Sequence, residues 1–115
     1  MSLPAQLFAA LRQLAGDRCF PEQIPQSNKD WPAIFYRITG TPQNTIGGDS
    51  DQDVYRVEIN LIDRSTDKIW ALRRPVFDAI DFAFDSAERI TDLPAPYDDS
   101  GALFRRVIEY YVRSE

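Results

Sequence analysis

Residues 33–39 read AIFYRIT and residues 54–62 read VYRVEINLI. In both stretches the side chains alternate in polarity, which is the period of a strand with one buried face. The second stretch sets Tyr55, Val57, Ile59 and Leu61 on one face and Arg56, Glu58 and Asn60 on the other. The two stretches therefore predict a pair of antiparallel, half-buried strands. The connection between them, residues 40–52, is far longer than the usual hairpin loop, and such loops often carry function.

Amphipathic helices are predicted on either side of this pair. The first carries one apolar stripe, in which Leu3, Leu7, Leu11 and Leu14 recur at helical spacing. Ser2 can cap its start and Gly16 can close its end. The second should begin at Thr66 and present an apolar stripe of Ile69, Leu72, Val76 and Ile80. Because Pro75 removes a helical hydrogen bond, we expect a kink near Ala71 or a break into two short helices.

The remaining segments complete an α+β pattern. Residues 19–30 contain Pro21 and Pro25 and are expected to be extended and irregular. Residues 86–93 predict a short strand, and residues 103–113 predict a long one. The order α-β-β-α-β-β predicts a single α+β domain over residues 1–115, with a four-stranded, mainly antiparallel sheet and both helices on one face.

Composition restricts the partners. Lys and Arg total 13 and Asp and Glu total 18, so the formal net charge is −5. An acidic chain is poorly suited to neutralising the phosphates of nucleic acid or to docking on anionic membranes. The single cysteine, Cys19, cannot form an intramolecular disulfide and is expected to be a buried thiol. No signal peptide or membrane span is predicted, so we expect the chain to be made in the cytoplasm.

The residues do not predict a catalytic, cofactor or metal site. The sequence has no histidine, one cysteine and no glycine-rich phosphate loop. Asp49, Asp51 and Asp53 alternate as in a calcium-binding loop, but Val54 stands where its glycine is needed and Asn60 where its glutamate is needed. An acidic, solvated loop end is the favoured interpretation of this run.

Charged pairs elsewhere in the sequence also favour structural roles. Glu58 and Asp63 should point to opposite faces of a strand, and Asp78 and Asp81 fit the solvent side of a helix. The pairs Arg73-Arg74 and Arg105-Arg106 are expected to form salt bridges rather than a phosphate site.

Apolar residues on the polar faces of the strands are a candidate interface. Phe35, Val107 and Tyr111 are predicted to point away from the helix-covered face. They are either scattered exposed side chains, which are common, or a patch that another subunit covers. The sequence leaves these two interpretations open because it does not determine the strand order.

As a whole, the chain resembles the tail completion family of long-tailed bacteriophages, which includes tail-to-head joining and tail terminator proteins. The resemblance covers residues 3–80 and depends on the order and spacing of short motifs. These are the leucine-striped helix, Phe20-Pro21, Ile24-Pro25-Gln26, the strand entry at residues 31–36, the strand end at residues 37–42, the polar loop at residues 43–48, the strand at residues 55–61 and the Thr-capped helix. Pro75 and the Trp31-Pro32 entry depart from the pattern.

The resemblance implies a non-enzymatic structural role. It predicts a homo-oligomeric ring, of a kind that is often a hexamer, at the head-proximal end of a phage or prophage tail. The ring would contact the tail tube or the head connector and would therefore be located in the virion. Residues 40–52 would then order on assembly and contact the neighbouring subunit or the tail tube. The candidate contact residues are Thr41, Pro42, Gln43, Asn44, Thr45, Ile46, Gly47 and Gly48.

Two other functions are compatible with the residues. One is a small cytosolic binding module, of the adaptor or immunity type, that uses residues 40–52 for recognition. The other is an enzyme that uses carboxylates alone, which the missing histidine and glycine motifs disfavour.

Overall fold

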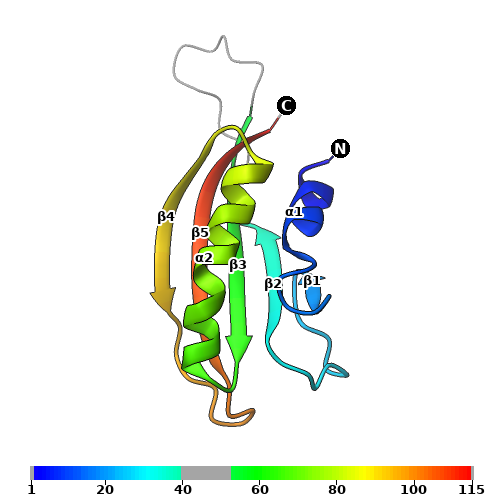
Figure 1. The fold of residues 1–115 in the computed structure, drawn as a ribbon, viewed down its shortest axis with the longest axis vertical. Helices are drawn as coiled ribbons and strands as arrows, with labels where there is room; N and C mark the ends of the chain where they lie inside the picture. Colours follow the sequence, from blue (N-terminus) through cyan, green and yellow to red (C-terminus); the bar gives the residue numbers. More distant parts are fainter. Residues whose placement is uncertain (1, 40–52, 115) are drawn as a thin grey trace.

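The structure, a computed structural model, describes residues 2–39 and 53–114. The candidate assembly loop, Thr41 to Gly48, lies outside the described residues. Two helices lie over one side of a long, twisted sheet (Figure 1). The elements in chain order are α1 (Leu3–Leu11), β1 (Cys19–Pro21), β2 (Ala33–Ile38), β3 (Asp53–Asp63), α2 (Thr66–Ala83), β4 (Ala87–Pro94) and β5 (Phe104–Ser114).

The sheet has five strands in the order β1-β2-β3-β5-β4. Strands β2, β3, β5 and β4 pair antiparallel, as predicted, whereas β1 adds to β2 in parallel. The predicted four-stranded sheet is therefore corrected to a mixed, five-stranded one. Strand β1 was missed because its three residues are too few to show alternation and because Pro21 suggested an irregular segment.

The predicted alternation places the core between the sheet and the helices. Val57, Ile59 and Leu61 of β3 are fully buried, and they lie in one cluster with the leucine stripe of α1 and the apolar stripe of α2. Ile108, Tyr110 and Val112 of β5 belong to the same cluster. At about 25 cal/mol per Å² of apolar surface removed from water, this cluster is the main source of stability.

The helix ends agree with the sequence in part. The Ser2 side chain accepts a hydrogen bond from the Ala5 N–H at 3.3 Å, which confirms the predicted cap of α1. The helix ends at Leu11, however, and Gly16 lies in the turns beyond it with a φ of 59°. The prediction that Gly16 closes the helix is therefore wrong.

The N-cap of helix α2 lies one residue earlier than predicted. Ser65, and not Thr66, accepts a hydrogen bond from the Lys68 N–H at 3.4 Å. The Asp63 carboxylate accepts the Ser65 N–H at 2.8 Å, so the chain turns directly after β3 and places Ser65 at the cap. The helix then runs unbroken for 18 residues across Pro75. The predicted break did not form because burial of Leu72, Val76 and Ile80 on one stripe outweighs one missing hydrogen bond.

Shortening Leu11 tests the core. Leu11 is fully buried, so Leu11→Ala should lower the free energy of unfolding by about 2–5 kcal/mol, through lost transfer energy and a cavity. Phe8→Ala on the same helix removes a side chain that is 39% exposed and should have a much smaller effect. Urea titrations of both variants measure the difference, and equal losses would contradict the assigned core.

Replacing Pro75 tests the unbroken helix. Pro75 is exposed and lies in the helix interior, so Pro75→Ala should restore a backbone donor without opening the core. We expect the free energy of unfolding to rise by about 1–3 kcal/mol. A thermal melt that moves to lower temperature would show that the proline is required where it stands.

Candidate functional site

The candidate site is the face of the sheet that the helices leave uncovered, which we call the open face. Strand pairing aligns five side chains in one row across it, Phe20, Phe35, Asn60, Val107 and Leu93. A row of Arg37, Glu58, Glu109 and Thr91 lies beside it. The open face thus consists of a mainly apolar row next to a charged one.

Charged side chains of the open face are linked to each other across strands. Arg37 of β2 donates to the Glu58 carboxylate of β3 at 2.9 Å, and the Asn60 amide donates to the same oxygen at 2.9 Å. Arg56 of β3 donates to the Glu109 carboxylate of β5 at 2.6 Å. The Arg37 guanidinium also lies 5.7 Å from the centre of the Phe35 ring. The Arg37 side chain thus lies close to Phe35 in the apolar row, as long charged side chains commonly lie along apolar surface.

The network holds Glu58 in its charged form. Partial burial of Glu58 acts to raise its pKa, but hydrogen bonds from Asn60 and Arg37 outweigh that effect, and the pKa of Glu58 is lowered. The hydrogen bond to Glu109 raises the pKa of Arg56. Both ion pairs therefore stay charged at neutral pH, and they place positive and negative groups side by side on the open face.

Three polar atoms of this face are buried and have no hydrogen-bond partner among the described residues. They are Asn60 Oδ1, Arg37 Nε and Arg105 Nε. Asn60 is fully buried at the centre of the apolar row. A buried polar group without a partner costs about 1–3 kcal/mol of stability.

The three predicted interface residues all lie on the open face. Phe35 and Val107 flank Asn60 in one row, and Tyr111 lies further along β5, opposite Arg56. They are not on adjacent strands, because β3 separates β2 from β5. Phe35 is only 7% exposed, so a partner could cover little of it. Tyr111 lines a shallow groove of about 230 Å³ with Val54 and Glu88.

A second cluster lies on the helix side, between α2 and β4. Arg73 of α2 and Arg106 of β5 both bind the carboxylate of Asp92 on β4, Arg73 through Nε at 2.9 Å. Partial burial acts to raise the pKa of Asp92, but the hydrogen bonds from the two arginines outweigh it and the pKa is lowered. Salt bridging was predicted for Arg73 and Arg106 and is confirmed. Asp92 was missed, although an acidic residue in a short edge strand could have suggested the pairing.

The remaining titratable residues considered for catalysis do not form a common site. Glu58 lies on the open face, whereas Asp63 lies on the other face and caps the turn into α2, as its strand parity predicted. Asp78 and Asp81 are exposed on α2. Cys19 is buried, and burial raises the pKa of its thiol to about 12, which matches the predicted apolar thiol.

Searches for two further kinds of site were negative over the described residues. Among residues 2–39 and 53–114, no three Cys, Asp or Glu side chains gather in a group that could hold a metal ion. No helix in the same ranges is long and apolar enough to cross a membrane.

The fold itself has a counterpart among solved structures. It matches a chain of the virion of a native gene transfer agent particle with a TM-score of 0.56 and 12% sequence identity. The match covers 97% of this chain and 93% of that chain. No protein-family profile and no curated protein matches the sequence. At this identity the similarity establishes a shared fold over nearly the whole length of both chains.

Removing the Glu58 charge tests the network. Because the pKa of Glu58 is lower in the folded chain than in the unfolded one, its contribution is present above the unfolded value, about 4.3, and is lost as pH falls through the folded value. Glu58→Gln should therefore flatten the loss of stability on acidification from pH 7 toward pH 3. Urea midpoints across this range measure the slope, and Glu88→Gln, an exposed carboxylate of β4, controls for net charge. Equal slopes for wild type and Glu58→Gln would contradict the assignment.

Proposed function

We propose that the protein is a non-enzymatic structural subunit of a phage or phage-like particle. In this proposal it completes the tail, forming a ring at the head-proximal end or joining the tail to the head. The observation that carries it is the near full-length fold similarity to a chain of a gene transfer agent virion. The order of motifs from residue 3 to residue 80, which resembles tail completion proteins, supports the same conclusion independently.

The two faces of the sheet support an assembly role. One face forms the core with both helices, and the helices leave the other face uncovered (Figure 1). This open face presents Leu93 at 61% exposure and two cross-strand ion pairs. A mixed apolar and charged surface of this kind is typical of interfaces that form between separately folded subunits.

The titratable groups support a role without catalysis. General acid–base catalysis needs a group whose pKa lies near the working pH. Here hydrogen-bond partners lower the pKa values of Glu58 and Asp92, and burial raises the pKa of the Cys19 thiol to about 12. These groups are held in single protonation states at neutral pH, which suits ion pairs and packing.

Purified particles provide the test. In the bacterium that encodes the chain, particles should contain it at a small, fixed copy number per particle, measured by quantitative mass spectrometry. Removing its gene should yield heads and tails that are not joined, or tails of abnormal length, in negative-stain images. Supplying the gene in trans should restore complete particles.

The proposal fails on either of two results. Complete, infectious or transducing particles from the strain without the gene would exclude a structural role at the head–tail junction. Particles that lack the chain altogether would exclude it as a virion component.

A further inference from the structure

We propose that copies of the chain associate head to tail, with Phe82 of one copy seated in the pocket beside Trp70 of the next. This inference rests on the proposed function, because a ring subunit needs two different surfaces that fit each other. The two surfaces lie on opposite flanks of α2, the first toward α1 and the second toward β4 (Figure 1).

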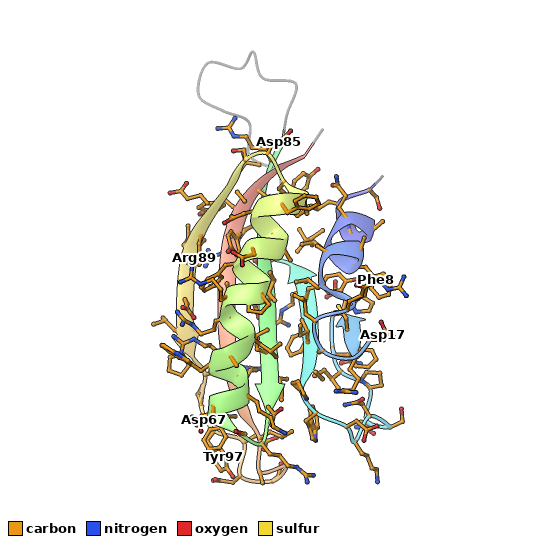
Figure 2. The ribbon with its side chains drawn as sticks, in the orientation of Figure 1. Phe8, Asp17, Asp67, Asp85, Arg89 and Tyr97 are labelled. Carbon is orange, nitrogen blue, oxygen red and sulfur yellow. The ribbon has the colours of Figure 1, made fainter. Side chains whose placement is uncertain are left out.

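The first surface is an aromatic knob in an acidic setting. Phe82, near the end of α2, is 94% exposed, which is unusual for a phenylalanine. It borders an apolar groove of about 330 Å³ between the helices, with Ala9 and Ala10 on α1 and Ala79 and Ala83 on α2. Asp78, Asp81 and Asp85 precede and follow it and are all exposed. Figure 2 shows Asp85 at the end of α2.

The second surface is an aromatic pocket in a basic setting. A cavity of about 120 Å³ is walled by Ile69, Trp70, Pro94 and Phe104, with Arg106 at its edge. Trp70 is 60% exposed, and guanidinium groups lie near its ring, Arg73 at 4.0 Å and Arg106 at 5.3 Å. Figure 2 shows Arg89 on β4 beside α2, where its guanidinium lies 3.9 Å from the Phe77 ring.

Charge selects the occupant of this pocket. The guanidiniums of Arg73 and Arg106 both bind one carboxylate, Asp92. The Arg89 guanidinium lies over the Phe77 ring, which Arg73 also approaches. The cluster therefore holds three cations and one carboxylate and is positive. The occupant that suits this pocket is therefore an apolar group flanked by carboxylates. Phe82, with three aspartates near it in sequence, is such a group. Aromatic side chains and arginines are also the residue types that dominate the centres of interfaces.

The placement of the two surfaces favours a head-to-tail contact over a two-fold one. In a two-fold contact each copy would insert Phe82 into the pocket of the other, so both surfaces would have to face the partner at the same time. The two surfaces, however, lie on opposite flanks of α2. A contact between opposite flanks instead leaves one free surface at each end, and it closes into a ring where the rotation between copies allows.

Disulfide trapping tests the contact. Ala79→Cys, in the groove beside Phe82, and Ala95→Cys, in the lining of the Trp70 pocket, keep both aromatic side chains. The two variants are made in separate chains, mixed in equal amounts and oxidised. Cys19 can stay in place, because it is buried and its thiol pKa of about 12 leaves it unreactive. Random pairing would put one chain of each kind in half of the cross-linked dimers. We expect this mixed dimer to make up more than half. Raising the salt to ~0.5 M should lower the excess, because it screens exposed charges.

Control variants show whether the cross-link reports a specific contact or random collision. Phe8→Cys, an exposed aromatic position on α1 outside both surfaces, should give random pairing with Ala95→Cys (Figure 2). Adding Asp78→Lys and Asp81→Lys to the Ala79→Cys chain should remove the excess. Random pairing of the original two chains, or an excess of either like-with-like dimer, would overturn the head-to-tail contact. That result would leave the proposed function standing if purified particles contain the chain.

Discussion

The whole structure depends on the pairing of β3 with β5 and on the alternation of side chains along it. The two strands pair without a break from Asp53 opposite Ser114 to Asp63 opposite Phe104. This pairing brings Val57, Ile59 and Leu61 into one sheet surface with Ile108, Tyr110 and Val112, and both helices pack on that surface. A shift of one residue would expose these side chains and bury Arg56, Glu58 and Glu109 instead, so the register is strongly determined.

The same alternation produces the open face. Each residue that points to the core has neighbours that point away from it, and in β3 these are Arg56, Glu58 and Asn60. Because both helices lie on the other side of the sheet, neither helix packs over these three residues (Figure 1). Cross-strand ion pairs satisfy most of the charge, and Asn60 Oδ1 is left without a partner among the described residues. Core and surface are thus two results of one strand pattern.

The sequence predicted the features that depend on residues close together along the chain, and it missed those that depend on contacts between elements. The long strands, the helix stripes and the outward direction of Phe35, Val107 and Tyr111 were predictable, because periodicity is a local property. Strand β1 was not, because its three residues are held by pairing with β2 and not by their own pattern. The Trp70–Arg73–Asp92–Arg106 cluster joins three successive elements, α2, β4 and β5, so no local pattern within one element could reveal it. The unbroken α2 shows tertiary packing overriding the local effect of Pro75.

Side-chain footprinting of the chain, free and inside purified particles, tests most directly whether it is a structural subunit whose exposed apolar groups become covered. Trp70, Phe82 and Leu93 are 60%, 94% and 61% exposed in the isolated fold, and all three react readily with hydroxyl radicals when accessible. The account predicts strong protection of all three in the particle. Equal labelling of the free and particle-bound chain, or a particle that contains no copy of it, would contradict the account.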